Sequence, residues 1–187
     1  MKYLGLDIST NCTGWAVIDE DTPVDYGVIT TDGQGLVKLH SFYVQLCNIL
    51  DDIDHLDWIG IEDTYVQNVV TTKTLSRYCG VAMLAVYSRF RVENIFHLKD
   101  FEEIQRRQKL PRAKVKIPLS GVYLPAPTEI FGTLNIPCPK DRELKKQTAI
   151  QWIKENLYID LKRDQDDIAD ALLLAFAVKE RVNKMQP

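Results

Sequence analysis

The sequence predicts an α/β fold in which helices flank a mixed β-sheet. Two observations indicate this class. Three short apolar segments separated by turn residues occupy the first 31 positions, and beyond them strand-like segments alternate with segments of helical apolar spacing. Strands that come first and then alternate with helices are typical of an α/β sandwich. With 187 residues, of which 45% are hydrophobic, we expect a single domain over residues 1–187.

The first half of the chain predicts four strands and one helix. An antiparallel meander is expected from "KYLGLDIS", "GWAVID" and "YGVITT", with a turn at residues 11–14 between the first two segments. Apolar residues from Leu36 to Ile53 then recur at helical spacing. The segment "WIGIE" at residues 58–62 follows as a short buried strand.

The rest of the chain predicts three helices and one more strand. Residues 70–90 form a second long helix, and "VENIFHL" at residues 92–98 is interpreted as a strand. Residues 141–157 and 166–183 form the two closing helices. The elements therefore alternate as an α/β sandwich requires.

Residues 104–139 break this alternation. Six of the eight prolines lie between Lys109 and Pro139, too many for a helix or a central strand, so we expect an insertion there. A basic loop of this length is expected to dock on the domain or to become ordered on a partner. From residue 104 to residue 128 the segment has no acid and six cations, which are Arg106, Arg107, Lys109, Arg112, Lys114 and Lys116.

Charge, cysteine spacing and hydropathy argue against several classes of protein. The formal net charge of −3 does not suit a uniformly basic nucleic-acid-binding surface, so DNA contacts have to come from local patches. The four cysteines are scattered without a CxxC pair, which indicates neither a zinc knuckle nor a disulfide framework. No apolar stretch is long enough for a bilayer and no leader opens the chain, so we expect a cytoplasmic protein without membrane contact.

Four acidic residues stand where a metal site could form. Asp7 ends the apolar strand "YLGLD" and Glu62 ends "WIGIE", and ligands of α/β sheets commonly lie beyond the carboxyl ends of strands. Asp167 and Asp170 are three residues apart and so share one face of the last helix. Clustered acids repel one another unless a multivalent cation binds between them, and oxygen ligands without His or Cys nearby favour Mg²⁺ or Mn²⁺.

Each of these acids also has a structural interpretation. Asp166 is a good N-cap, acids in a first helical turn interact favourably with the helix dipole, and a strand-end Asp often begins a turn. Asp170 is harder to explain in this way, because it directly precedes an apolar run, where a carboxylate needs a cation or hydrogen-bond donors. We therefore interpret Asp164 and Asp166 as solvated or capping residues and Asp167 and Asp170 as metal ligands.

The motifs around these acids resemble those of the RuvC family of Holliday junction resolvases, members of the RNase H-like nuclease superfamily. The segment "LGLDISTNCTGWAVI" resembles the first motif of the family, "IGIEDTYV" the second, and "DIADALLLA" the closing D-x-x-D-A-L motif. The segment "TKTLSRYCGVAMLAV" resembles the intervening helix with its central glycine, here Gly80. Together they cover nearly the whole chain, and the basic, proline-rich insertion is a departure. The resemblance implies an RNase H-like mixed five-stranded sheet flanked by helices.

The resemblance also implies which residues act. Asp7, Glu62, Asp167 and Asp170 match the catalytic, metal-binding acids of the family, which implies two Mg²⁺ ions per site, with Mn²⁺ as a substitute. In "KKQTAIQWI", Lys146 aligns best with the active-site lysine, and Lys145 is the alternative. Tyr65 matches an aromatic residue that stacks on an unpaired base of the junction. We also expect DNA contacts at Lys73 and Arg77 on the helix over residues 70–90, at Lys145 next to the active-site lysine, and at the six cations of the insertion.

We therefore expect a metal-dependent endonuclease of DNA recombination and repair. The resemblance implies a homodimer that cuts Holliday junctions or other branched DNA by paired nicks, leaving 5′-phosphate and 3′-hydroxyl ends. A non-catalytic DNA-binding scaffold of the same fold and a nuclease acting on RNA–DNA hybrids are the alternatives. An actin-like domain shares the first strand and the Thr-Gly hairpin, but 187 residues are too few for its two halves, so we expect no nucleotide cofactor.

Overall fold

The computed structural model describes residues 1–63, 69–92, 94–108 and 120–185. Their strands form one mixed sheet in the order β3-β2-β1-β4-β6-β5. The first three strands are an antiparallel meander, and β1, β4, β6 and β5 run parallel to one another. The strands are β1 (Lys2–Asp7), β2 (Cys12–Asp19), β3 (Thr22–Thr30), β4 (Trp58–Ile61), β5 (Ile95–Phe96) and β6 (Gly121–Tyr123).

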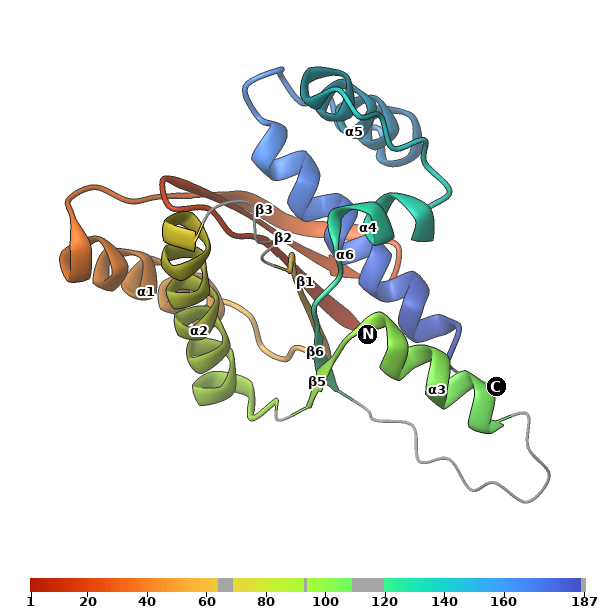
Figure 1. The fold of residues 1–187 in the computed structure, drawn as a ribbon, viewed down its shortest axis with the longest axis horizontal. Helices are drawn as coiled ribbons and strands as arrows, with labels where there is room; N and C mark the ends of the chain where they lie inside the picture. Colours follow the sequence, from red (N-terminus) through yellow and green to blue (C-terminus); the bar gives the residue numbers. More distant parts are fainter. Residues whose placement is uncertain (64–68, 93, 109–119, 186–187) are drawn as a thin grey trace.

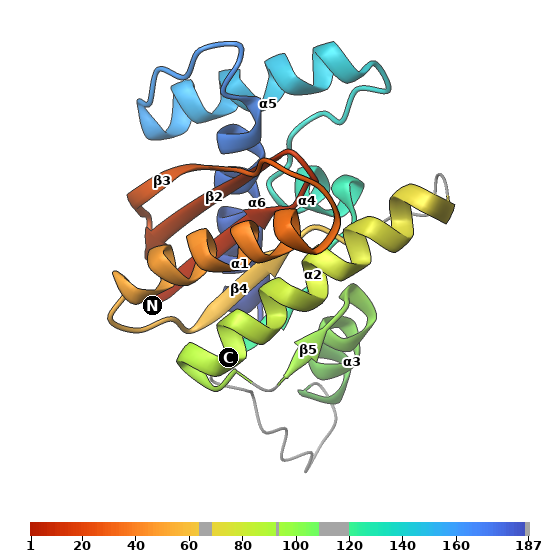
Figure 2. The ribbon, with the colours of Figure 1, turned by 90° about the vertical axis from the view of Figure 1, so that its left-hand side faces the viewer.

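Helices cover both faces of this sheet (Figures 1 and 2). One face packs against α1 (Gly35–Asp51) and α2 (Val69–Phe90), and the opposite face packs against α6 (Asp166–Asn183). Two further helices, α4 (Pro127–Thr133) and α5 (Arg142–Leu157), pack on the outer side of α6. The remaining helix, α3 (Leu98–Gln108), lies near the C-terminal end of α6 (Figure 1). The predicted α/β sandwich is therefore confirmed.

The alternation of side chains along β1 and β4 divides the core into two clusters. Tyr3 and Trp58 belong to the cluster on the α6 face, whereas Leu4, Leu6 and the isoleucines of β4 belong to the cluster on the α1 and α2 face. In the parallel register of these strands Leu6 pairs with Ile61. The next residue of each strand therefore faces α6, since side chains alternate with a period of two.

Three glycines on that face let α6 lie close against the sheet. A Cβ atom on Gly5 would lie 2.1 Å from the carbonyl oxygen of Ala171, and one on Gly14 would lie 1.9 Å from that of Asp167. A Cβ on Gly60 would lie 2.6 Å from the Val178 side chain. These glycines belong to β1, β2 and β4, so α6 lies against the backbone of three neighbouring strands. The distance between sheet and helix thus depends on residues without a side chain.

The structure corrects two expectations about residues 92–139. The sheet of the described residues has six strands instead of five, because β6 pairs with both β4 and β5. Residues 109–139 were expected to contain neither a helix nor a central strand, yet they contain all of β6 and all of α4. The prolines there lie outside the strand, and Pro127 begins α4, where its missing N–H costs no hydrogen bond. The strand predicted over 92–98 is limited to Ile95–Phe96.

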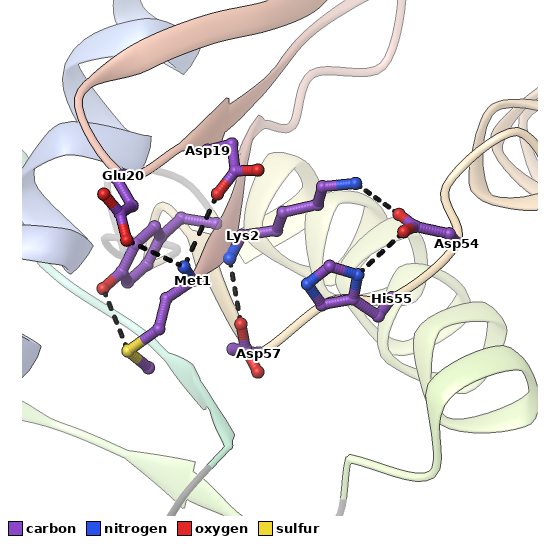
Figure 3. Close-up of polar contacts among 8 residues, drawn as sticks. Met1, Lys2, Asp19, Glu20, Asp54, His55 and Asp57 are labelled. Carbon is purple, nitrogen blue, oxygen red and sulfur yellow. Dashed lines mark hydrogen bonds and ion pairs between the residues drawn. The ribbon is translucent and has the colours of Figure 1, made fainter.

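Acidic side chains gather at the end of the sheet where β1 begins (Figure 3). The N-terminal ammonium lies 3.5 Å from Asp19 Oδ1, and the backbone N–H of Lys2 donates to Asp57 at 2.9 Å. The Lys2 ammonium pairs with Asp54, which also contacts His55. These acids have cationic or N–H partners, and they account for part of the negative net charge. In the described residues no helix is long and apolar enough to cross a membrane.

The contact between Gly5 and α6 can be tested by a pair of glycine substitutions. We expect Gly5→Ala to lower the free energy of unfolding by about 3 kcal/mol or more, because the new methyl group overlaps backbone atoms that cannot move separately. The control is Gly80→Ala, in the interior of α2, where a Cβ meets nothing within 4 Å. It should raise the free energy of unfolding by about 0.5 to 1 kcal/mol. Urea denaturation measures both, and equal effects would contradict the close approach.

Candidate active site

A cleft of about 490 Å³ opens at the carboxyl ends of β1 and β4. It brings together the four predicted acids and both candidate lysines. Its walls come from the first turns of α2, α5 and α6 and from the loop after β1. The lining residues are Asp7, Ile8, Ser9, Glu62, Asp63, Thr71, Thr72, Leu75, Pro127, Arg142, Lys145, Lys146, Asp166, Asp167 and Asp170.

The fold places the four acids by strand register and by helix packing. Asp7 directly follows Leu6, and Glu62 directly follows Ile61, the residue with which Leu6 pairs. Both carboxylates therefore lie on the α6 face of the sheet. Asp167 and Asp170 lie in the first two turns of α6, and the approach of Gly14 to the Asp167 backbone brings these turns down onto β2. The convergence of four acids therefore follows from the same contacts that build the core.

Burial and mutual repulsion raise the pKa of three of these carboxyl groups. Burial is the main cause of the rise for Asp7, whose pKa lies well above the ordinary value and is raised further by the charges of Glu62, Asp170 and Asp167. Burial also raises the pKa of Glu62 to about 7 and that of Asp170 to about 6, although the charge of Lys145 acts in the opposite direction on both. At neutral pH the cleft therefore favours the binding of protons or of cations.

The two candidate lysines have different surroundings. The positive charge of Lys145 lowers the pKa values of Asp7, Glu62 and Asp170, so its ammonium group faces the cluster of acids. Lys146 Nζ instead lies 2.5 Å from Asp166 Oδ2, and this hydrogen bond raises the pKa of Lys146. The sequence alignment favoured Lys146, whereas the electrostatics of the cleft favour Lys145 as the lysine next to a bound phosphate.

Hydroxyl groups fix the loop that follows Asp7. Ser9 Oγ donates to the carbonyl of Cys12 at 2.6 Å and accepts from the Cys12 N–H at 3.0 Å. Thr13, whose side chain is buried, donates to the Ser9 carbonyl at 3.1 Å and accepts from the Ser9 N–H at 3.3 Å. This network closes the turn between β1 and β2 and so holds the wall of the cleft next to Asp7.

The structure places a thiol next to the acids, which the sequence did not indicate. Cys12 makes a side-chain hydrogen bond with Asp167, and burial, this bond and nearby acids raise the Cys12 pKa to about 12. The thiol therefore stays protonated at neutral pH and donates to the carboxylate. Because a thiol binds metals as the thiolate, the acids remain the ligands that suit the cleft.

The residues of the cleft fit hard divalent cations by the chemistry of their donor atoms. Four carboxylates supply oxygen ligands, and their repulsion is relieved when a divalent ion lies between them. Within the described residues, however, no three His, Cys, Asp or Glu side chains are already arranged to hold one ion. Metal binding thus requires the carboxylates to turn toward a common point.

Asp166 and Asp164 differ in their roles. Asp166 was expected to be a capping or solvated residue, but the N-cap of α6 is Gln165, and Asp166 is the first helical residue. Its carboxylate lines the cleft and binds Lys146. Asp164 is exposed, as predicted for a solvated residue.

The remaining predicted DNA-binding residues lie in three places. Lys73 and Arg77 are exposed on α2, beside the cleft. Arg106 and Arg107 lie on α3, where both bind Glu103. Gln105 of α3 donates to the Lys184 carbonyl just after the C-terminal end of α6, so α3 and these arginines lie toward the opposite end of α6 from the acids. The other predicted residues, Tyr65, Lys109, Arg112, Lys114 and Lys116, fall outside the described residues.

Sequence reasoning did not single out several polar side chains of the cleft, among them Asp63, two threonines and an arginine. Thr71 and Thr72 line the cleft from the first turn of α2, and Arg142, the first residue of α5, lines it from α5. Arg142 lies three residues before Lys145, which places the two side chains on one face of α5. That spacing was a usable signal, since "RELKK" puts three cations into two helical turns.

Comparisons with known proteins identify relatives among resolvases. No family model matches the chain. It is 30% identical over 92 residues to the crossover junction endodeoxyribonuclease RuvC of Magnetococcus marinus, and this alignment covers 46% of the chain and 51% of that protein. The chain thus matches about half the length of this curated relative.

Solved structures agree over nearly the whole chain. Thermus thermophilus RuvC bound to a Holliday junction substrate has a TM-score of 0.65 at 13% identity, covering 95% of this chain and 92% of that one. The fowlpox virus resolvase bound to Holliday junction DNA has a TM-score of 0.52 at 13% identity, with 96% and 97% covered. The likeness shows a RuvC-type, RNase H-like fold.

The raised pKa of Glu62 predicts how stability depends on pH. Between its ordinary value of 4.5 and about 7, this carboxyl binds more protons in the folded than in the unfolded protein, so rising pH lowers the free energy of unfolding. Glu62→Gln should remove this loss. In metal-free protein we expect the variant to gain stability over the parent between pH 5 and pH 8, on the order of 2 kcal/mol.

Urea denaturation at the two pH values, in the presence of a chelator, measures this gain. The control is Glu102→Gln, which alters an exposed glutamate of α3 and should leave the pH dependence unchanged. An equal difference between parent and Glu62→Gln at both pH values would contradict the burial of this carboxyl.

Proposed function

We propose that this chain, a distant relative of the RuvC-family Holliday junction resolvases, is a metal-dependent endonuclease that cuts Holliday junctions or other branched DNA. One observation carries the proposal: four acids from β1, β4 and α6 line one cleft together with Lys145. Burial and repulsion raise the pKa of three of these acids, so their charged forms are disfavoured unless cations bind beside them. A phosphodiester can enter such a cleft only together with cations.

Asp7, Glu62, Asp167 and Asp170 are the residues that would hold two Mg²⁺ ions, with Mn²⁺ as a substitute. When bound, such ions supply a water activated for attack and stabilise the leaving 3′ oxygen. The acids would hold such ions, and the hydrogen bond of the Cys12 thiol would keep the Asp167 carboxylate in place. Products with a 5′-phosphate and a 3′-hydroxyl are expected from the resemblance to the RuvC family.

Lys145 and the hydroxyls of α2 act on the substrate itself. We assign to Lys145 the neutralisation of charge that builds up on the phosphate, because it is the cation whose field reaches three of the acids. Arg142, Lys146 and Thr71 lie around the mouth of the cleft, where they contact neighbouring phosphates. Lys73 and Arg77 extend this surface along α2.

Two sets of predicted DNA contacts remain. Tyr65 is retained as a proposed stacking residue from its spacing to Glu62, and the basic residues 109–116 are retained as proposed phosphate contacts from their charge. Arg106 and Arg107 lie on α3, toward the opposite end of α6 from the acids, so we propose that they bind a more distant part of the substrate.

Paired nicks require two active sites, and α2 is our candidate for the dimer surface. Leu84 and Tyr87 are 58% and 41% exposed on this helix, and Gly80 has no atoms around the position of a Cβ. Small and apolar residues on one helix face suit a self-complementary contact. A monomer in sedimentation experiments, with and without junction DNA, would argue against paired cutting.

Two other functions are weaker candidates. A non-catalytic scaffold gains nothing from buried acids that repel one another and lower stability at neutral pH. A nuclease acting on RNA–DNA hybrids has the same chemistry, and only the substrate distinguishes it. Cleavage assays with four-way junctions, forks, linear duplex and RNA–DNA hybrid therefore belong in the same experiment.

Asp7→Asn should abolish cutting and keep binding, because the amide preserves shape while removing the charge that holds the ions. End-labelled four-way junctions incubated with and without Mg²⁺ measure cutting, and gel shifts in Ca²⁺ measure binding. Paired nicks that need Mg²⁺ and disappear in the variant are the expected result. Undiminished cutting by Asp7→Asn would remove this residue from the mechanism.

The two lysines of α5 make a matched pair. We expect Lys145→Ala to lower the rate of cutting at saturating DNA by about 10² to 10³, the effect of losing one group that stabilises transition-state charge. Lys146→Ala should lower it only a few-fold, since this ammonium is engaged by Asp166. Single-turnover rates compare them, and the reverse order of effects would restore Lys146 as the active-site lysine.

A further inference from the structure

A second groove, of about 600 Å³, adjoins the carboxylate cleft. Thr71 lines both hollows, so the groove begins where the cleft ends. Its walls are the β1–β2 loop, the start of α1 and one face of α2. The lining residues are Thr10, Gly33, Gln34, Gly35, Leu36, Lys38, Leu39, Thr71, Thr74, Arg77 and Tyr78.

The chemistry of this groove is opposite to that of the cleft. None of the residues that line it is acidic, and Lys38 and Arg77 contribute two positive charges from opposite walls. Lys38 Nζ donates to Asn11 Oδ1 at 2.6 Å, which holds the cation against the β1–β2 loop. Threonines and a tyrosine add hydroxyl groups between the cations. Such a surface is complementary to a phosphodiester backbone.

An exposed apolar residue stands at the rim of the groove. Leu36 is 82% exposed in the first turn of α1, directly after a turn in which Gly33 and Gly35 have φ angles of 90° and 55°. These left-handed conformations suit glycine and fix the direction in which α1 begins. The neighbouring Val37 is 72% exposed but does not line the groove. Leucine side chains of this kind pack against unstacked bases in other DNA complexes.

We propose that this groove binds an unpaired strand of the branched DNA as that strand leaves the carboxylate cleft. Lys38 and Arg77 hold its phosphates, and Leu36 packs against a base or deoxyribose next to the branch point. The inference rests on the proposed nuclease function and extends it, because it assigns the preference for branched over linear DNA to a surface that binds a separated strand.

The first test measures salt-dependent binding of four-way junctions in Ca²⁺ by the full chain. In the double variant Lys38→Gln, Arg77→Gln we expect the slope of log K against log salt concentration to decrease by about two. The glutamine at position 38 keeps a donor for Asn11. The control is Lys99→Gln, Lys184→Gln, which removes two exposed cations at the far end of α6 and should leave the slope unchanged.

The second test uses a fork with 2-aminopurine beside the branch point. The parent protein should change its fluorescence on binding, and Leu36→Ser should reduce that change and weaken binding about tenfold. Val37→Ser changes a similarly exposed neighbour that does not line the groove, and it should alter neither the fluorescence change nor the affinity. Equal effects of the two substitutions would contradict a role for Leu36.

The outcomes separate the groove from the nuclease function. If the parent protein binds and cuts branched DNA but the Lys38 and Arg77 variant keeps the same salt slope, the groove proposal is wrong and the proposed function stands. Failure of the parent to bind any DNA would overturn both. A decreased slope in that variant and not in its control, together with the Leu36 effect, would support the groove.

Discussion

The close contact between α6 and the sheet is the constraint on which the rest of the structure depends. Gly5, Gly14 and Gly60 remove side chains from three adjacent strands, and α6 fills that space with its backbone at Gly5 and Gly14 and with side chains at Gly60. Residues 168, 169 and 171–178 are buried, because α4 and α5 cover the outer face of the helix. The same packing brings the first two turns of α6 to the ends of β1 and β4. Stability and the geometry of the cleft are therefore determined by one interface.

This arrangement places acids where folding alone would not favour them. At the opposite end of the sheet, Asp19, Asp54 and Asp57 have the N-terminus, the Lys2 ammonium and a backbone N–H as partners. At the cleft, burial and repulsion instead raise the pKa values of Asp7, Glu62 and Asp170. The apolar contacts of α6 offset this cost in the metal-free protein. The two ends of the sheet thus differ in how far the protein itself supplies the counter-charge for its acids.

Much of the fold and the position of the four acids could be predicted from the sequence, because both follow from local patterns. Asp7 and Glu62 end apolar strands, and the period of two decides which face they take. The strand β6 was missed because it is three residues long and lies between prolines, and only its pairing with β4 and β5 reveals it. The contact of Cys12 with Asp167 joins residues distant in the chain, and the surroundings of Lys145 and Lys146 depend on how α5 is rotated against α6. Neither has a signal in local spacing.

The opposite charges of the cleft and the groove separate the requirements for binding from those for cutting. Phosphates are repelled by the four acids until cations neutralise them, whereas Lys38 and Arg77 attract a strand without any ion. A strand bound in the proposed groove would extend past Thr71, and its next phosphate would then lie beside the acids of the cleft. In the proposed nuclease, binding then precedes metal loading, and cutting is limited to DNA in which one strand separates from its partner and reaches both hollows. The proposed preference for branched DNA thus depends on the position and charge of these two surfaces, since the carboxylates do not distinguish one DNA from another.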